Sequence, residues 1–317
     1  MSGKEQAKRL AADATGIAEA VRVLIGGGTV ALPTETVYGL AARADSSDAV
    51  AAIYRAKGRP RFNPLIVHVD DMATAQSLAL FDDTALALAQ WGWPGPLTLV
   101  LPRNAGALLA PDVTAGLPTV AVRMPAHPVI RAVLQQCGLP LAAPSANRSG
   151  AVSPTSADHV QQSLGGRIDM ILDGGTAARG LESTIVAVRT DGSVEELRPG
   201  PLNLTAWPGK LRGATSPSGS GRIEAPGQLD SHYAPGKPVR LNAMQPEDDE
   251  FFIGFAAPPG SADCDLSAGG NLEEAAARLY ACLHLAAASP KPRIAVAPVP
   301  VEGVGRAIND RLRRAAA

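Results

Sequence analysis

Short β-branched runs alternate with helical patterns over about the first two hundred residues, and this alternation limits the folds open to the chain. A strand-like run at 28–34 (GTVALPT) precedes a helical pattern at 46–58 (SSDAVAAIYRAKG), and a further strand-like run follows at 64–69 (PLIVHV). Similar runs occur near Leu97, Thr119, Ile168 and Ser183. Because strand and helix periods alternate in this way in α/β domains, the sequence predicts that fold class.

A stretch rich in Gly, Ser and Pro divides the chain. Residues 209–227 lack apolar periodicity and are interpreted as a linker. A second α/β pattern begins at 237–241 (KPVRL) and includes helical stretches from Asn271 and near Gly303. We therefore predict a large domain at 1–208, a linker or lid at 209–236, and a small domain at 237–317. The small domain shows no obvious catalytic cluster, so a lid, scaffold or interaction role is expected for it.

Composition and cysteine usage limit the possible environments. The formal net charge is −1, so no large field draws the protein to nucleic acid or to an anionic membrane. The N-terminal stretch 3–25 is amphipathic and predicts a first helix rather than a signal peptide, and no run of about 18 apolar residues predicts a membrane span. Cys137, Cys264 and Cys282 have no paired spacing, which argues against a disulfide framework or a cysteine zinc site and fits a reducing cytoplasm.

The densest cluster of cations lies at 54–69 (YRAKGRPRFNPLIVHV). Ser46 or Ser47 is expected to cap a helix that runs to Lys57, and Gly58 to end it. Pro60 then biases Arg59 toward an extended conformation, which fixes the two cations at a corner. A solvated helix end, where the dipole favours cations, is the alternative.

Two strand patterns each carry an unexpected polar residue. In 65–69, His68 shares a face with Ile66, while Leu65, Val67 and Val69 share the other. A lone strand histidine is more often structural than functional. In 119–125 (TVAVRMP), Thr119, Ala121 and Arg123 share one face. An arginine there suits a carboxylate or phosphate because its fork binds two oxygens; a surface salt bridge is the alternative.

Two polar loops follow strand-like runs. One contains Thr34, Glu35 and Thr36, and the other, at 141–156, is rich in serine and includes an asparagine. Small hydroxyl and amide groups at strand ends hold ligands in open α/β sheets, although they are also common turn formers. Neither loop is a phosphate-binding P-loop, and the glycine run at 26–28 lacks the lysine and hydroxyl that such a loop requires.

Several of these segments, taken in order, carry a family resemblance. The chain resembles the YrdC-like family of L-threonylcarbamoyladenylate synthases in its long, two-domain form. The matching motifs are PTETVYGL at 33–40, KGRPRFNPLIVHV from Lys57, SAN at 145–147, APGQLDSHYAP at 225–235 and RAINDRLRRAA at 306–316. The resemblance implies a YrdC-like twisted open sheet flanked by helices, followed by a smaller Rossmann-like α/β domain.

The resemblance also implies a reaction. Members of this family are nucleotidyltransferases that join L-threonine, bicarbonate and ATP into threonylcarbamoyl-AMP, with release of pyrophosphate and water. N-carboxythreonine attacks the α-phosphate, so catalysis depends on positioning and charge neutralisation rather than on a protein nucleophile. Mg²⁺ is expected with ATP, held mainly by phosphate oxygens and water. The tRNA threonylcarbamoyl-transfer machinery is the expected product acceptor, with direct tRNA binding weak or absent.

Site residues follow by resemblance, position by position. Lys57 and Arg59 are the expected catalytic cations. The expected ATP contacts are Lys57, Arg59, Asn63, Thr119, Ser145, Asn147, Ser153, Arg198 and Tyr233. The expected threonine contacts are Thr36, His68, Arg123, Ala143 and Ser183, with Arg123 on the carboxylate. His232 and Tyr233 are expected to form a lid that excludes water from the labile product.

Two other functions compete with the synthase reaction. Hydrogenase-maturation carbamoyltransferases share the fold of the first domain, but they carry cysteine-rich zinc modules that three scattered cysteines exclude. A noncatalytic nucleotide- or RNA-binding module could use the cluster from Lys57 to Arg61. Such a module favours a basic face and exposed aromatic residues, whereas this chain is nearly neutral and has 4% aromatic residues.

Overall fold

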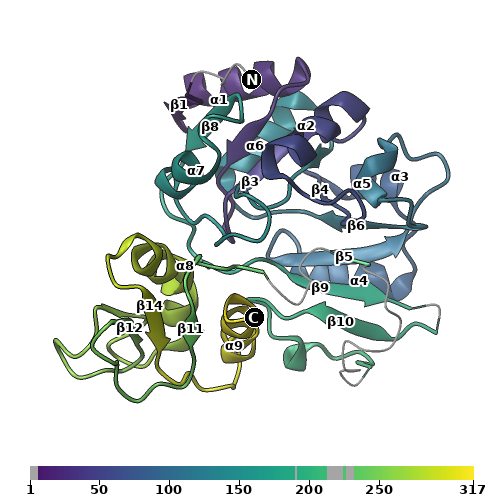
Figure 1. The fold of residues 1–317 in the computed structure, drawn as a ribbon. Coiled ribbons are helices and arrows are strands. Elements are labelled where there is room, and N and C mark those ends of the chain that lie inside the picture. The colour runs from purple at the N-terminus through teal and green to yellow at the C-terminus, as the bar shows by residue number, and fades with distance from the viewer. Residues whose placement is uncertain (1–5, 190, 213–223, 226–231) are drawn as a thin grey trace.

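Two α/β domains of unequal size make up the protein (Figure 1). The computed structural model describes residues 6–189, 191–212, 224–225 and 232–317. Most of the predicted linker falls on 213–223 and 226–231 and lies outside these described residues. The predicted combination of a large α/β domain with a smaller one is confirmed.

The large domain is built on a ten-stranded mixed sheet with the order β1-β8-β2-β3-β7-β4-β6-β5-β9-β10. The strand pairs β4 with β6 and β5 with β9 are parallel, whereas β5 with β6 and β9 with β10 are antiparallel. The strands are β1 (Lys8–Ala11), β2 (Val30–Leu32), β3 (Gly39–Arg43), β4 (Ile66–His68), β5 (Leu97–Pro102), β6 (Thr119–Arg123), β7 (Leu141–Ala142), β8 (Met170–Asp173), β9 (Thr184–Val188) and β10 (Val194–Arg198).

Helices cover the two faces of this sheet unequally. One core contains Leu65, Val67 and Val69 of β4 and its flank, and another packs α1 and α6 on β2 and β8. The opposite face of β4 and β6 carries only a small cluster that includes Ile66 and Ala121. The helices are α1 (Ala14–Ile25), α2 (Ser47–Lys57), α3 (Met72–Leu78), α4 (Asp83–Gly92), α5 (Pro111–Thr114), α6 (Pro128–Cys137), α7 (Ala157–Leu164) and the 3₁₀ turn η1 (Leu204–Ala206).

Local sequence signals set the ends of α2 as expected. Ser46 is the N-cap, and its side chain accepts a hydrogen bond from the amide of Ala49. Gly58 adopts a left-handed conformation, with φ of 62°, and ends the helix. Lys57 is the last helical residue, so Arg59 starts the loop toward β4.

The prediction of a single first helix in the N-terminal stretch is wrong for 8–11. These residues form β1, which pairs in parallel with β8 in the register Lys8↔Met170. Asp13 then caps α1 by accepting from the amide of Gly16. β1 has three exposed positions and one half-buried position, so its sequence lacks the alternation that marks a strand. The strand forms because it pairs with β8.

The second domain contains a parallel sheet with the order β11-β14-β12-β13. Helix α9 lies between this sheet and β10 of the large domain (Figure 1), where Arg306 forms an ion pair with Glu196. The apolar core of the second domain includes Leu181 and Tyr233, so the two domains share buried surface. Its elements are β11 (Val239–Arg240), β12 (Glu250–Gly254), β13 (Cys264–Asp265), α8 (Leu272–Ala288), β14 (Arg293–Val296) and α9 (Gly305–Ala315).

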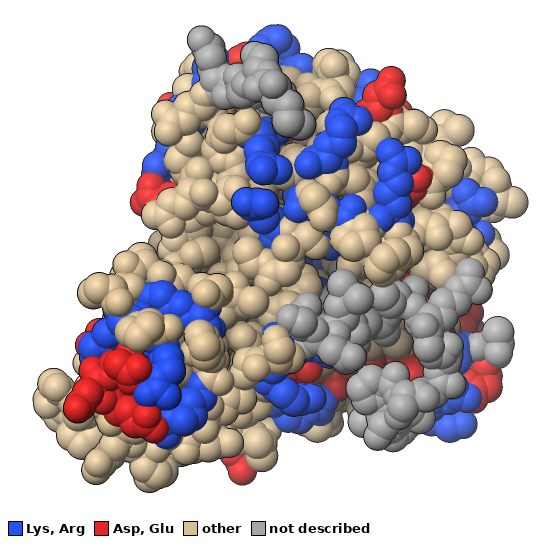
Figure 2. Space-filling model, in the orientation of Figure 1, with Lys and Arg blue, Asp and Glu red and all other residues tan. Residues whose placement is uncertain are grey.

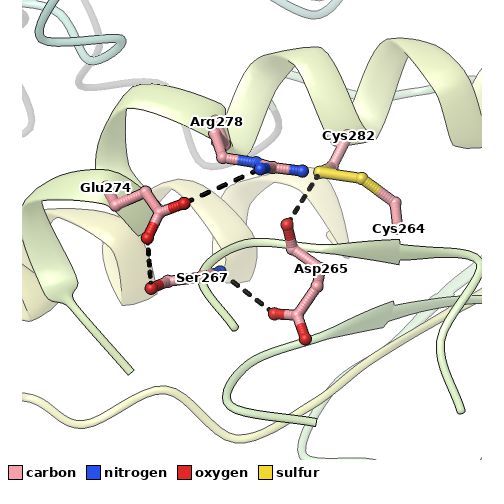
Figure 3. Close-up of a disulfide and its surroundings, with 6 residues drawn as sticks. All are labelled: Cys264, Asp265, Ser267, Glu274, Arg278 and Cys282. Carbon is pink, nitrogen blue, oxygen red and sulfur yellow. Dashed lines mark hydrogen bonds and ion pairs between the residues drawn. A yellow bond between two sulfur atoms is a disulfide. The ribbon is translucent and has the colours of Figure 1, made fainter. Parts of the chain in front are cut away.

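Cys264 and Cys282 form a disulfide, so the expectation of unpaired cysteines is wrong (Figure 3). Cys264 starts β13, and Cys282 faces it from α8, which places their Cα atoms 6.0 Å apart. Packing of α8 on the sheet brings together two residues that are 18 positions apart. The third cysteine, Cys137, is buried and free.

The disulfide predicts a thiol count and a stability effect. Denatured, unreduced protein should expose one reactive thiol, and reduction should raise the count to three. Reduction should also lower the free energy of unfolding of the second domain by about 3 kcal/mol, because it releases a short closed loop in the unfolded chain. Thiol titration and urea unfolding with and without reductant measure both effects. A Cys264→Ser variant, which should not respond to reductant, is the control; three thiols before reduction would contradict the assignment.

Candidate active site

A polar cavity lies where β4 and β6 end. Its wall is formed by the loop after β2, the segment after β7, the start of β9 and the end of β10, and the side chains of His232 and Tyr233 close it. Its volume is about 50 Å³, which is room for only a few water molecules. Segments that are far apart in the sequence therefore meet at one small site.

The parallel pairing of β4 with β6 brings two predicted residues together. Its register is Ile66↔Ala121 and His68↔Arg123, so the histidine and the arginine lie on neighbouring strands and point to the same face. Both side chains are buried, at 3% exposure each. The surface salt bridge considered for Arg123 is therefore wrong, because its ionic contact lies inside the protein.

Arg123 is held by the loop after β2. Its Nη1 donates to Thr36 Oγ1 at 2.9 Å, and its Nη2 donates to Glu35 Oε1 at 2.5 Å. Its Nε donates to the Gly95 carbonyl at 3.1 Å. Burial raises the pKa of Glu35, but the Arg123 charge outweighs it and holds that pKa below its usual value. Three of the five N–H groups of a guanidinium are used in these bonds, and the other two are donors that suit a carboxylate ligand.

His68 is a neutral side chain with an unused ring atom. Burial, with Arg123 adding to it, lowers the pKa of His68 to about 3. Its Nδ1 is buried and has no hydrogen-bond partner among the described residues. A buried polar atom without a partner is costly, so this atom is a natural contact for a ligand in the cavity.

Lys57 and Arg59 are buried, at 3% and 8% exposure, so the solvated helix end considered for them is wrong. The ammonium of Lys57 donates to the carbonyls of Ser145 and Asn147, each at 2.5 Å. The Arg59 guanidinium donates to the side-chain oxygen of Asn63 at 2.6 Å. These acceptors are neutral, so they leave the positive charge of both groups uncancelled by a direct carboxylate contact.

Burial lowers the pKa values of Lys57 and Arg59. Burial and the neighbouring Arg59 hold the pKa of Lys57 well below its usual value, and nearby Glu182 opposes them only in part. Burial likewise lowers the pKa of Arg59 to about 10. A bound anion would reverse this effect, since an opposite charge favours the protonated form. The cluster is thus suited to phosphate oxygens.

Arg198 ends β10 and joins the cluster from the other side. Its Nε and Nη2 donate to the Ser183 carbonyl at 3.1 and 2.9 Å, and Nη2 also donates to Ser183 Oγ at 3.1 Å. Ser183 Oγ lies 2.8 Å from Thr98 Oγ1. The antiparallel pair of β9 and β10 therefore fixes a hydroxyl and a guanidinium at the same wall.

The predicted site residues fall into three groups by position. All five expected threonine contacts line the cavity, as do Arg59, Ser145, Arg198 and both lid residues. Lys57, Asn63 and Ser153 do not line the cavity, but each bonds to a residue that does, namely Ser145, Arg59 and Glu182. Asn147 lies one step further back, where its carbonyl accepts from Lys57. Thr119 lies apart from them, at the start of β6 and about 13 Å along the strand from Arg123.

Sequence reasoning missed Glu182, which also lines the cavity. It immediately precedes Ser183 and is 6% exposed. Its carboxylate accepts hydrogen bonds from Ser153 of the large domain and from Tyr280 and Arg311 of the second domain. The available signal was a charged residue shortly before the apolar run of β9. The partners of Glu182 lie far away in the sequence, so the sequence does not indicate them.

The described residues contain no group of three or more His, Cys, Asp or Glu side chains that could hold a metal ion. Among the described residues, the carboxylate that lines the cavity is Glu182, and Glu35 lies behind Arg123; both are bonded to arginines. This donor set does not fit a resident Mg²⁺ site. Within the same described part of the chain, no helix is both long and apolar enough to cross a membrane.

Charged side chains differ between the domains on the face in Figure 2. On the second domain, Lys and Arg lie beside Asp and Glu. On the large domain the blue side chains are separated by uncharged residues. Among the described residues, this face shows no continuous basic stripe.

Comparison with known proteins identifies the family of the chain. Residues 22–200 match the family model described as telomere recombination, and residues 193–317 match the model described as threonylcarbamoyl-AMP synthase, C-terminal domain. A threonylcarbamoyl-AMP synthase of Bacillus subtilis (strain 168) is 41% identical over 95% of this chain and 92% of its own length. The chain belongs to the threonylcarbamoyl-AMP synthase family.

Other members of the threonylcarbamoyl-AMP synthase family agree with this assignment. The enzyme of that name from Pyrococcus abyssi is 38% identical over 91% of this chain and 90% of its own length. The crystal structure of P. abyssi Sua5 complexed with L-threonine matches with a TM-score of 0.88 and 35% identity, covering 98% of each chain. The predicted family, enzyme class and two-domain architecture are therefore confirmed.

The buried histidines predict an acid-sensitive fold. Burial lowers the pKa of His68 and His232 to about 3 and that of His284 to about 4 in the folded protein. In the unfolded chain these groups take up protons below about pH 6.5, so stability falls as pH drops from about 6.5 toward 4. Between pH 7 and pH 5 the free energy of unfolding should fall by about 2 kcal/mol for each such histidine.

Urea unfolding at pH 7 and pH 5 measures this loss. His284 lies on α8, where its Nε2 is 3.1 Å from the Ser153 carbonyl, and its ring stacks on His159 with centroids 3.8 Å apart. A His284→Gln variant keeps a hydrogen-bond donor but removes the titrating group, so it should lose less stability over this interval. An equal loss in both proteins would contradict the assignment.

Proposed function

We propose that this protein is a cytoplasmic enzyme that converts L-threonine, bicarbonate and ATP into threonylcarbamoyl-AMP, pyrophosphate and water. One observation carries the proposal. A single cavity joins the fork of Arg123 to the buried cations Arg59 and Arg198, with Lys57 directly behind its wall. One part of this cavity suits an amino-acid carboxylate, and the other suits phosphates. Their adjacency is what the joining of an amino acid to a nucleotide requires.

Threonine is assigned to the part of the cavity around Arg123. The two remaining N–H groups of the guanidinium bind its carboxylate, while Thr36, His68 and Ser183 offer hydroxyl and imidazole groups to its hydroxyl and amine. Ala143 shapes the wall there. The amine condenses with bicarbonate, with loss of water, to give the carbamate. A buried and neutral His68 suits this chemistry because it adds no further charge.

ATP is assigned to the cationic part. The carbamate oxygen attacks the α-phosphorus, and the bond to the bridging oxygen of pyrophosphate breaks. Lys57 and Arg59 stabilise the charge that develops on the leaving pyrophosphate. The remaining nucleotide contacts are assigned to Asn63, Thr119, Ser145, Asn147, Ser153, Arg198 and Tyr233.

His232 and Tyr233 act as the lid. Their rings lie 4.1 Å apart, and the small volume of the cavity beneath them leaves no room for both substrates. They move aside for ATP and close afterwards, which keeps water away from the mixed anhydride. Mg²⁺ enters with the ATP phosphates, since Glu182 of the cavity wall and Glu35 behind Arg123 are already bonded to arginines.

The product supplies the tRNA threonylcarbamoyl-transfer machinery, with little direct binding of tRNA by this protein. The alternative, a noncatalytic RNA-binding module, depended on the cluster from Lys57 to Arg61. Lys57 and Arg59 are buried, so they do not present a basic face to RNA. Arg61 alone of these three cations is largely exposed, with its side chain 68% accessible.

Pyrophosphate release tests the reaction. Purified protein is given ATP, Mg²⁺ and bicarbonate, with L-threonine, L-serine or no amino acid. Release that requires both threonine and bicarbonate is the expected result. Release that does not depend on threonine would overturn the proposal and leave a nucleotide-binding protein of another function.

An Arg123→Lys variant tests the assignment of the carboxylate. Lysine keeps a positive charge for Glu35 but lacks the fork, so the KM for threonine should rise roughly tenfold or more while the KM for ATP changes little. The same pyrophosphate assay, with each substrate varied in turn, separates the two constants. An Arg103→Lys variant serves as the control, and equal increases in both constants would contradict the assignment.

A further inference from the structure

The second domain reaches the wall of the cavity through one buried carboxylate. Glu182 Oε2 accepts from Tyr280 at 2.8 Å and from Arg311 Nε at 2.9 Å, while Oε1 accepts from Ser153 at 2.5 Å and from Tyr280 at 3.0 Å. Tyr280 lies on α8 and Arg311 on α9. Two helices of the second domain thus hold a side chain that lines the site in the first.

Glu182 does not have the properties of a catalytic base. Both of its oxygens are occupied by donors, as described above. Burial raises its pKa, but Arg311 and Arg198 outweigh burial and hold the pKa at about 2. A carboxylate in this state stays ionised and accepts no proton near neutral pH.

An ionised carboxylate at this place should oppose binding of ATP. Glu182 interacts electrostatically with Lys57 and Arg198, two of the cations assigned to the phosphates. An uncompensated negative charge would repel phosphate oxygens and would cancel part of the field of these cations. The site therefore needs a further positive charge directed at Glu182.

Arg311 supplies that charge. It is fully buried, and its Nη1 donates to Asp310 at 2.8 Å. Asp310 is also paired with Arg314 at 3.2 Å, so Arg311 is not its only cation. The Arg311 guanidinium also lies 5.4 Å from the ring centroid of the lid residue Tyr233, whose ring is 5.5 Å from that of Tyr280. The same two side chains therefore contact both the lid and the carboxylate.

We propose that Arg311 and Tyr280 are positioning residues that neutralise and orient Glu182, so that the cavity has its full affinity for ATP only when the second domain is docked. This inference rests on the proposed function for the identity of the ligand. It gives the second domain a specific part in substrate binding through side chains that touch no substrate.

A double-mutant cycle tests the inference by equilibrium binding of ATP, and of inorganic pyrophosphate, measured by calorimetry. Arg311→Met should weaken ATP binding roughly tenfold or more, because it removes the ion-pair partner of the buried Glu182 carboxylate. Adding Glu182→Gln to that variant should restore most of the affinity, since it removes the uncompensated charge. Arg313→Met, on the same helix but with its side chain 70% exposed, is the matched control and should bind as the unmodified protein does.

Rescue separates positioning from simple stabilisation. If Arg311 only stabilised the fold, the double variant would bind ATP no better than Arg311→Met, and this result would overturn the inference. If Arg311→Met does not fold, Tyr280→Phe removes only the hydroxyl that bonds Glu182, and it should weaken ATP binding several-fold with restoration by Glu182→Gln. No change in ATP affinity in Tyr280→Phe would likewise count against the inference.

The outcomes also separate this inference from the reaction. Protein that binds ATP and shows the rescue, but releases no pyrophosphate with threonine and bicarbonate, would support the inference and overturn the proposed reaction. Protein that makes threonylcarbamoyl-AMP but shows no rescue would support the proposed reaction and overturn the inference. Protein that binds neither ATP nor pyrophosphate would overturn both.

Discussion

Buried positive charge at the edge of the large sheet is the constraint on which the surrounding structure depends. Moving a cation out of water is costly unless oxygens replace its hydration. Lys57 obtains two carbonyls from the loop after β7, and Arg59 obtains the Asn63 side chain and nearby carbonyls. Because these acceptors are neutral, the site keeps an excess of positive charge that an anionic ligand can neutralise.

The uneven covering of the sheet explains where this charge is placed. One face of β4 and β6 packs against helices through Leu65, Val67 and Val122. The other face carries Ile66 and Ala121, followed by His68 and Arg123 where the strands end. The strand alternation that builds the core on one face therefore aims the histidine and the arginine into the cavity on the other. A shift of one residue in the register would place both side chains in the apolar core.

The second domain acts on this site through few but buried contacts. Tyr280 and Arg311 reach Glu182, and His284 reaches the Ser153 carbonyl. Tyr280 and His284 lie on α8, and the disulfide of Cys282 ties that helix to β13 (Figure 3). A fixed helix presents its side chains with little freedom, which suits a role in positioning. An interface of this kind couples the docking of the second domain to the state of the cavity.

The sequence by itself determined features that depend on neighbouring residues. Caps at Ser46 and Gly58 set α2, and strand alternation placed His68 and Arg123. The order of motifs identified the family, and the five residues that the resemblance assigned to threonine all line one cavity. Local conformation and period are written in short windows, so a single sequence suffices to read them.

Only the tertiary structure decided the features that join distant segments. Strand β1 exists through its pairing with β8, and the disulfide exists because α8 packs on β13. Glu182 meets Tyr280 and Arg311 across 98 and 129 positions of the chain. No periodicity records which distant donor a buried carboxylate will find, because packing of whole domains sets that distance and short-range conformational preference does not.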